Sequence, residues 1–438
     1  MPDTLGAKII ADLRAKRLPQ MVDWFDPGLL VRIGIRDMIS GTIGQYADQR
    51  LMQAASDKVK SEQELAHRYD YSNTESGDPD RRIQCDADGA VWIDYISDLG
   101  DGFEATYAMA TLMAPETLVV AAAGSGQPAL TLKAGEILVM GGDQAYPQAT
   151  AEEYEKRLIN PYSWAFTTSD PQRKLFAIPG NHDWYDGLGA FTALFTAARS
   201  RISDGLGRQI GGWRSMQHRS YFAIKLPHDW WIWGPDIQLG GSLDDPQRDY
   251  FDIVADYTKP GDKIILCLAE PSWLHQNYDN LHEINLMARK RGAKVCAMLA
   301  GDWHHYSRYA NDELGVALIT CGGGGAFAHA THQLKDNIEL DWAIGSDEGA
   351  PDAGAQPIVV PAAVAAPVAM TPEGSGFLPR AGASASAPGV AAAPAALESQ
   401  ERYQKFRAKF SARKKSPLRK SNVRRKTFNC EAKAIYPS

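Results

Sequence analysis

The sequence predicts an α/β domain with mixed sheets as the main part of the chain. Between about residues 90 and 330, short runs rich in β-branched residues alternate with segments of helical period, and this alternation is typical of layered α/β domains. The runs 221–226 and 230–234 are separated by only three residues, which favours an antiparallel pair. An antiparallel pair beside strands joined by helices indicates sheets that are mixed rather than purely parallel.

Eight runs are expected to form strands: 91–97, 136–141, 174–178, 221–226, 230–234, 263–269, 294–300 and 315–321. Helices are expected after Asp245 and after Asp279, where apolar side chains recur with helical spacing. Similar spacing from Leu29 to Ile39 predicts that residues 1–80 form a helical N-terminal extension. The main domain is therefore expected over residues 81–340.

Two segments follow this domain. Residues 346–397 are rich in Ala, Pro, Gly and Ser, so 341–400 is predicted to be a disordered linker. The segment 401–438 carries 13 Lys and Arg against 2 Glu, a net charge of +11 in a chain of net charge −7. A short helix is expected over 402–410. The acidic remainder disfavours broad contact with nucleic acid, but the basic segment can reach nucleic-acid phosphates or an anionic membrane surface.

Composition places the chain among ordinary globular proteins. Of its 438 residues, 44% are hydrophobic and 23% are charged, which excludes a wholly disordered or fibrous protein. The longest apolar stretch, 357–370, is broken by prolines and cannot span a membrane, and the first 17 residues lack the apolar core of a secretory signal. Five widely spaced cysteines without a C-x-x-C pair favour a reducing compartment. A cytoplasmic protein is expected.

Five polar motifs come at or just after the ends of expected strands: SDLGDG (97–102), GGD (141–143), GNHD (180–183), AEP (269–271) and GDWHHY (301–306). Loops at the carboxyl ends of strands in α/β sheets converge on one crevice. The side chains expected there are Asp98, Asp101, Asp143, Asn181, His182, Asp183, Glu270, Asp302, His304 and His305. So many carboxylates repel one another unless cations neutralise them. The motifs therefore predict a two-metal centre of the kind used in phosphoryl displacement.

In this order, the motifs resemble those of the calcineurin-like metallophosphoesterase superfamily over residues 90–330. The resemblance implies a four-layer sandwich of two mixed sheets flanked by helices. It also implies hydrolysis of a phosphomonoester or phosphodiester through a dinuclear metal centre and a metal-bound water. In this comparison Asp98 and His304 match ligands of metal one, Asp143 matches the bridging carboxylate, and Asn181 matches a ligand of metal two that also contacts substrate.

The resemblance further implies that His182 protonates the leaving group or steadies the transition state, while Asp183 orients its ring. Weaker candidates for substrate contact or for support of the ligands are His305, His329, His332 and Arg219. For each of them a purely structural or exposed position is the competing interpretation.

Three positions depart from the family pattern. Gly100 replaces the histidine of D-x-H, Glu270 replaces the histidine before proline, and Asp302 replaces the first histidine of G-H-x-H. Asp101 is close enough to help fill the first vacancy, although it can also be a turn residue. A ligand set rich in carboxylates suits Mn²⁺ or Mg²⁺, with Fe as a further candidate, better than Zn²⁺.

The segments 24–30, 234–251 and 321–332 resemble a bacterial branch of the superfamily, and 427–438 resembles the close of its domain. If so, 340–426 is an insertion and the end of the chain returns to the core. Two other functions remain open. One is a catalytically degenerate fold that acts as a binding or regulatory module, and the other is an adaptor for nucleic acid or a membrane surface that works through the basic segment.

Overall fold

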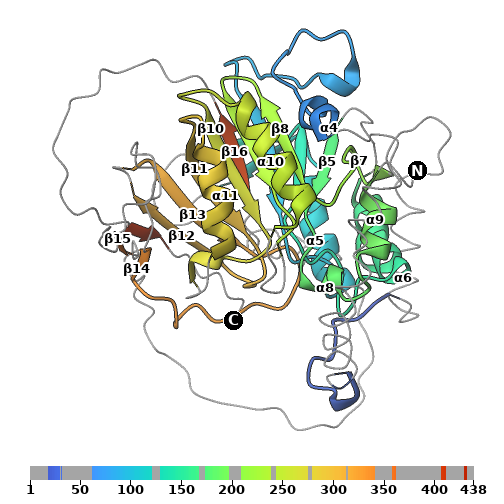
Figure 1. Ribbon diagram of the computed structural model, residues 1–438. Helices are drawn as coiled ribbons and strands as arrows, with labels where there is room; N and C mark the ends of the chain where they lie inside the picture. The colour runs from blue at the N-terminus through green and yellow to red at the C-terminus, as the bar shows by residue number, and fades with distance from the viewer. Residues whose placement is uncertain are drawn as a thin grey trace, which may run out of the picture.

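The chain folds into two large mixed β-sheets with helices on their outer faces (Figure 1). The computed structural model describes residues 18–29, 31, 62–120, 129–166, 173–196, 209–237, 243–274, 279–311 and 314–340, and the backbone of 358–361, 406–410 and 429–431. This is the α/β sandwich of two mixed sheets that the sequence predicts, so the fold class is confirmed. Within the described residues, no helix has the length and apolar character of a membrane-spanning segment.

The first sheet has six strands. In spatial order they are β16 (Phe406–Phe410), β1 (Val91–Ile96), β4 (Ile137–Met140), β5 (Lys174–Ala177), β7 (Trp213–Ser215) and β6 (Gln209–Ile210). Strands β1, β4 and β5 are parallel, and Ile96 pairs with Met140, which pairs with Ala177. The carboxyl ends of these three strands therefore lie side by side.

The second sheet has seven strands. In spatial order they are β17 (Asn429–Glu431), β12 (Tyr306–Asn311), β13 (Val316–Cys321), β11 (Lys294–Ala300), β10 (Lys263–Leu268), β9 (Trp230–Gly234) and β8 (Phe222–Leu226). Strands β9, β10, β11 and β13 are parallel, whereas β8 and β9 form the antiparallel pair expected from the sequence. The ends of β10 and β11 thus meet at one edge.

Two small antiparallel pairs complete the strands: β2 (Thr117–Val120) with β3 (Leu130–Lys133), and β14 (Asn337–Leu340) with β15 (Ile358–Pro361).

Helices cover both sheets. Over the first sheet lie α5 (Phe103–Met113), α6 (Ala151–Tyr154), the π-helix η2 (Glu155–Ile159), α7 (Asn160–Ala165) and α9 (Gly189–Phe195). Over the second lie α4 (Glu62–Arg68), α10 (Asp245–Tyr257) and α11 (Asp279–Arg289) (Figure 1). Short helices are η1 (Pro79–Arg81), α8 (Asn181–Trp184) and η4 (Ser272–Leu274). Helix α10 begins where the Asp244 carboxylate accepts a hydrogen bond from Gln247 N at 2.9 Å.

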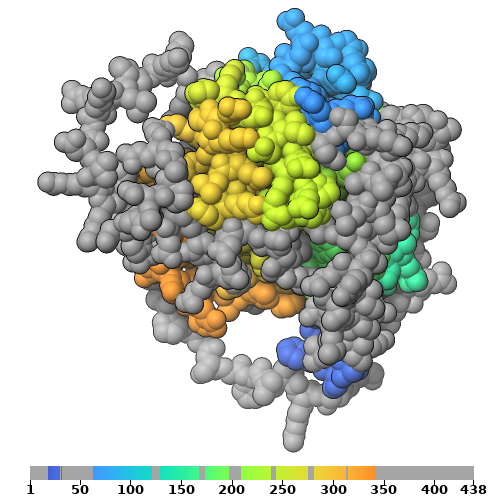
Figure 2. Space-filling model, viewed as in Figure 1, coloured from blue at the N-terminus to red at the C-terminus, as the bar shows by residue number. Residues whose placement is uncertain are grey.

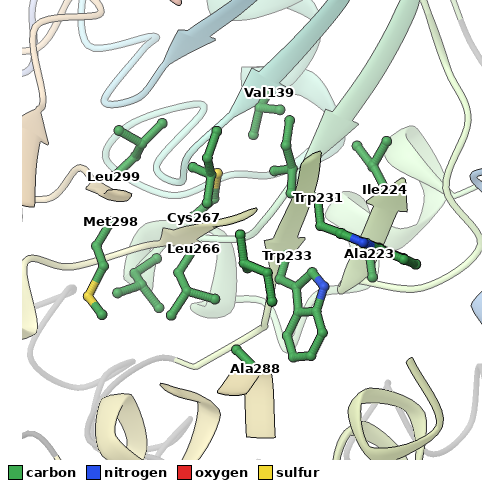
Figure 3. Packing of buried hydrophobic residues seen from close by; sticks show 14 of the residues in the cluster. Val139, Ala223, Ile224, Trp231, Trp233, Leu266, Cys267, Ala288, Met298 and Leu299 are labelled. Carbon is green, nitrogen blue, oxygen red and sulfur yellow. The ribbon is translucent and has the colours of Figure 1, made fainter. Parts of the chain in front are cut away.

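The pleat of β4 shows why the first sheet is buried on both faces. Ile137 and Val139 pack into the core shared with the second sheet, whereas Leu138 and Met140 pack under α5 and α9. Side chains that alternate along a strand point to opposite faces, and each fully buried aliphatic side chain contributes about 1.5–3 kcal/mol. Side chains of β8–β11 pack on both faces of the second sheet, towards β4 on one side and towards α11 on the other (Figure 3). The two faces together hold the strand ends in place.

Three expectations about the chain ends need revision or fall outside the described residues. The helix expected over 402–410 is wrong, because Phe406–Phe410 forms β16 and pairs with β1. Within the expected linker 341–400, residues 358–361 form β15, while the rest lies outside the described residues. Most of the helical pattern of residues 1–80 also lies outside them; α4 is a described part.

Candidate metal centre

Hydrogen bonds join the loops that follow the parallel strands of both sheets. Asp98 N donates to Gly142 O at 3.0 Å and links the loops after β1 and β4. Gly301 N donates to Ala269 O at 3.1 Å and links the loops after β11 and β10. Asp302 N then donates to Asp98 Oδ1 at 3.0 Å, from one sheet to the other. Polar motifs from both sheets therefore meet at one edge of the sandwich.

Three aspartates at this edge have left-handed backbone conformations. The φ angles are 59° for Asp98, 52° for Asp143 and 65° for Asp302. A residue other than glycine in this region costs of order 1–3 kcal/mol, which the surrounding structure must hold in place. Such outliers gather at functional sites, and here all three carry a carboxylate that the sequence assigned to the metal centre.

Tyr146 stands at the middle of the centre and was not among the residues expected there. Its hydroxyl oxygen lies 3.1 Å from Asp98 Oδ1, 3.1 Å from Asp143 Oδ2 and 3.0 Å from His304 Nε2. The side chain is fully buried. The available sequence signal was its position three residues after Asp143, in the loop that follows β4.

The glycine at position 100 is explained by the close approach of the backbone just before Tyr146. Gly100 has φ 63°, and a Cβ there would lie 2.5 Å from the carbonyl oxygen of Gln144, so no side chain fits. Gly100 O instead accepts a hydrogen bond from Tyr146 N at 3.1 Å. A histidine is therefore excluded at this position, and the Tyr146 hydroxyl provides a donor atom beside Asp98.

The Tyr146 hydroxyl has one proton for the three acceptor atoms that it contacts. His304 Nδ1 lies 2.8 Å from the Phe327 carbonyl oxygen, which can only accept, so Nδ1 carries the proton and Nε2 of the neutral ring is an acceptor. The single Tyr146 hydroxyl proton thus faces three acceptors, on Asp98, Asp143 and His304. A cation among these oxygen and nitrogen atoms would satisfy all of them at once.

Burial makes the negative charge of this centre costly. It raises the pKa of Asp98 to about 7, and it raises the pKa of Asp143 well above the ordinary range, with further contributions from the charges of Asp183 and Asp98. Burial, Asp98 and Glu270 together raise the pKa of Asp302 to about 7. Burial also lowers the pKa of His304 to about 4. Near neutral pH the centre favours bound protons or a bound cation over bare carboxylates.

Asn181 contributes an oxygen without a hydrogen-bond partner. Its Nδ2 donates to the Tyr185 hydroxyl at 3.4 Å, whereas Oδ1 is buried and makes no hydrogen bond. A buried carbonyl oxygen normally has a partner. This orphaned atom therefore fits the role of cation or substrate ligand that the sequence suggested.

His182 is oriented by Pro147 and not by Asp183, which corrects the sequence-based expectation. Its Nδ1 donates to Pro147 O at 2.8 Å. Asp183 instead accepts hydrogen bonds from the backbone amides of Gly180 at 2.7 Å and Asp143 at 2.9 Å. Its buried carboxylate thus shapes the loops that carry Asp143 and Asn181. Burial lowers the pKa of His182 to about 4, so its ring is neutral at pH 7.

Some of the candidate metal-ligand atoms belong to residue types that bind metals less often, namely the oxygens of Tyr146 and Asn181. In the part of the chain that the structure describes, no three His, Cys, Asp or Glu side chains are grouped so that they could hold a metal ion. A cation here would need the Tyr146 or Asn181 oxygen. Glu270 lies close enough to Asp302 to raise its pKa. The donor types fit a hard divalent cation.

Asp101 is held away from this role by other contacts. Its Oδ1 accepts a hydrogen bond from Val22 N at 2.9 Å. Its Oδ2 accepts from Trp24 Nε1 and from Phe327 N, each at 3.3 Å. The sequence-based suggestion that Asp101 fills the vacancy at Gly100 is not supported, because both carboxylate oxygens bind other segments.

The four weaker candidates differ in their positions. The His329 ring stacks on His304 with 4.4 Å between ring centroids, so it borders the centre. His305 is buried, and its Nε2 lies 3.2 Å from Ser307 Oγ. His332 is exposed. Arg219 is buried in the segment before β8 and donates to His218 O at 3.5 Å, so the exposed position considered for it is wrong.

Comparisons with known proteins give only distant likenesses. No protein-family model and no curated protein matches the chain. Among solved structures it is similar to GAP50, the anchor in the inner membrane complex of Plasmodium, with 13% identity and a TM-score of 0.37 over 57% of this chain and 76% of that one. It is also similar to the purple acid phosphatase PPD1 from yellow lupin (Lupinus luteus) seeds, with 10% identity and a TM-score of 0.38 over 64% of this chain and 55% of that one. The fold assignment rests on the sheet topology above, and the chemistry of the site on its own side chains.

Proposed function

We propose that the chain is a metal-dependent phosphoesterase of the calcineurin-like type, in the bacterial branch whose segments it resembles. The observation that carries this proposal is the Tyr146 hydroxyl, which lies within 3.1 Å of Asp98, Asp143 and His304. The hydroxyl has one proton for these three acceptor atoms, and a divalent cation could bind all of them together with the hydroxyl oxygen. Phosphoester hydrolysis is the chemistry that a cation-filled crevice at strand ends supports best.

The residues that would hold two divalent ions come from both sheets. Asp98, His304 and Tyr146 would hold one ion, and Asp143 would contribute a carboxylate to both. The unpartnered Asn181 oxygen would contribute to a second ion, for which Glu270 and Asp302 are further candidate ligands. Mn²⁺ or Mg²⁺ suits this oxygen-rich set, with Fe as a further candidate. When bound, such ions polarise phosphoryl oxygens and make a coordinated water more acidic.

His182 is the residue that would handle the proton of the leaving group. Its Nδ1 proton is engaged by Pro147 O, so Nε2 of the neutral ring carries a lone pair. An anionic phosphoester beside Nε2 raises the pKa of the ring, because a nearby negative charge favours the imidazolium. The protonated ring can then give its proton to the departing oxygen.

Two substitutions test this function. Asp143→Asn and His182→Ala are each expected to lower kcat by about 10²–10⁴-fold on the better of a 4-nitrophenyl phosphomonoester and a diester. Asp252→Asn and His67→Ala, at exposed positions on α10 and α4, serve as matched controls with parental turnover. Parental rates in both Asp143→Asn and His182→Ala would overturn the assignment of the site.

A second candidate function is a catalytically degenerate binding module. The same Tyr146 contacts favour it, because a proton-bridged centre can exist without a metal. Titration of the full chain with Mn²⁺ separates the two functions: a module of this kind binds no Mn²⁺ at the centre, or binds it without turnover on the ester panel.

The location and wider partners are also proposals. We propose that the protein is cytoplasmic and that residues 401–438, with a net charge of +11, bind a membrane surface or nucleic acid. Electrostatic binding of this kind weakens steeply with salt. Binding of the full chain to anionic vesicles or RNA that persists after removal of this charge would contradict the proposal.

A further inference from the structure

The segment Leu18–Leu29 is attached to the edge of the candidate metal centre. Pro19 O accepts a hydrogen bond from Phe103 N at 3.0 Å, and Gln20 O accepts one from Arg157 Nη1 at 3.0 Å. Figure 1 shows this segment in dark blue at the end of the molecule where α8 lies, and in Figure 2 parts of it reach the surface. The attachment brings a distant part of the sequence beside the site.

Two residues of the loop after β1, Asp101 and Gly102, contact the segment Leu18–Leu29 directly. Asp101 accepts hydrogen bonds from Val22 N and Trp24 Nε1 through separate carboxylate oxygens. Gly102 leaves space for Met21, because a Cβ at position 102 would lie 2.7 Å from Met21 Cγ and 3.2 Å from Met21 N. The contact depends on residues of both segments, the N-terminal segment and the loop after β1, and is therefore specific.

The Trp24 ring contacts the rings at the centre. Its centroid lies 5.7 Å from Tyr146, 5.6 Å from His182 and 5.6 Å from Phe327. The Trp24 side chain is only half-buried. Because His182 is the residue proposed to protonate the leaving group, a leaving group that reaches it also comes close to the exposed part of the indole.

The charge around the centre limits what that leaving group can be. Among the described residues, no lysine or arginine side chain forms an ion pair with Asp98, Asp143, Glu270 or Asp302, and Nε2 of the neutral His304 ring lies 3.4 Å from Asp98 Oδ1. Arg157, which approaches Asp101, is directed to backbone oxygens and to Glu153. In the described part of the chain no cationic side chain would balance further negative charge on a leaving group, whereas a neutral planar leaving group can stack on the indole.

We infer that Trp24 is a specificity-determining residue that packs against a planar, uncharged leaving group of a phosphoester, such as an aryl or nucleoside group. Asp101 is the positioning residue that holds Trp24 in place. This assignment rests on the proposed phosphoesterase function. The experiment therefore measures ligand binding independently of ester hydrolysis.

The test is calorimetric titration of the full chain in Mn²⁺ with phenylphosphonate and with methylphosphonate, two probes that are not hydrolysed. The parent is expected to bind phenylphosphonate about three- to tenfold more tightly, the usual range for one aromatic contact. Trp24→Ala removes this preference and Trp24→Phe retains most of it. Phe25→Ala is the matched control, because Phe25 is 92% exposed, and it keeps the parental ratio. A parent that binds neither probe or shows no preference, or a Trp24→Ala variant that keeps the preference, overturns the assignment.

A second arm tests Asp101. Asp101→Ala is expected to lower the phenyl-to-methyl ratio towards that of Trp24→Ala and to increase hydrogen exchange of residues 18–29, whereas Asp101→Asn retains part of both because its amide oxygen still accepts. Loss of Mn²⁺ binding with an unchanged ratio overturns this role and makes Asp101 a metal ligand. If the phosphonate ratios behave as expected while the parent hydrolyses no ester, only the proposed function fails.

Discussion

The hydroxyl oxygen of Tyr146 lies 3.0 Å from Nε2 of His304, although 158 residues separate the two in the chain. The first follows a strand of one sheet and the second follows a strand of the other. Because His304 Nδ1 donates to Phe327 O, its Nε2 is an acceptor directed at the hydroxyl. This contact joins the two sheets at the candidate metal centre.

Tyr146→Phe is expected to weaken Mn²⁺ binding by about 10- to 100-fold, the usual range for losing one supporting group of a metal site. The substitution removes one oxygen atom and keeps the ring that packs between Trp24 and His182. Calorimetric titration measures the change. Tyr162→Phe is the control, because Tyr162 is equally buried and its hydroxyl contacts Met113 Sδ at 3.6 Å. Equal affinity in both variants would remove Tyr146 from the donor set.

Divalent cations are expected to stabilise the fold. Mn²⁺ at about 100 times its dissociation constant adds about 2.7 kcal/mol to the free energy of unfolding, which raises the Tm of a domain of this size by about 5–10 °C. Differential scanning calorimetry in Mn²⁺ and in EDTA measures the shift. An unchanged Tm would show that the folded protein has no cation site of this affinity.

The stability of the metal-free protein is expected to fall as pH rises from about 6.5 to 8. The pKa values of Asp98 and Asp302 are raised to about 7 in the folded state, so the stability that their bound protons contribute is full below the unfolded value of 3.8 and is lost as pH rises through 7. The lowered pKa values of His182 and His304 act in the opposite direction, but only below the ordinary value of 6.5.

Within that pH window the carboxyl groups therefore determine the trend. Saturating Mn²⁺ is expected to flatten it, because the cation replaces the protons. The measurement is Tm against pH with and without EDTA. A metal-free Tm that stays constant or rises between pH 6.5 and 8 would contradict the charge balance described for the centre.

Gly180→Ala is expected to lower the free energy of unfolding by about 1–3 kcal/mol, the usual cost of overpacking, and to reduce turnover. A Cβ at this position would lie 2.0 Å from Asp143 Oδ1 and 2.3 Å from Asp143 N, so Asp143 must move. Gly189→Ala at the start of α9 is the control, since the nearest atom there is Asp186 Oδ2 at 3.6 Å. Urea denaturation measures both. Equal stability of the two variants would show that the Gly180–Asp143 contact is not tight.

The sequence alone determined the α/β class and the main strands, because period and β-branched composition are local properties. It also indicated that the loops with Asp98, Asp143 and His304 meet, since parallel strands end at a common edge. The expected helix over 402–410 was wrong at Phe406–Phe410, where FRAKF alternates apolar and polar residues with the period of a strand and pairs with β1.

Only the tertiary structure decided the roles of Tyr146, Asp101 and Asp183. The Tyr146 hydroxyl contacts Asp98, Asp143 and His304, and a side chain at Gly100 would clash with Gln144 O; no spacing rule contains either relation. Asp101 is taken up by Val22 and Trp24, and Asp183 by the amides of Gly180 and Asp143. The sequence shows that a position is an aspartate but not which hydrogen-bond donors its carboxylate contacts. Those donors come from distant segments that only the folded chain brings together.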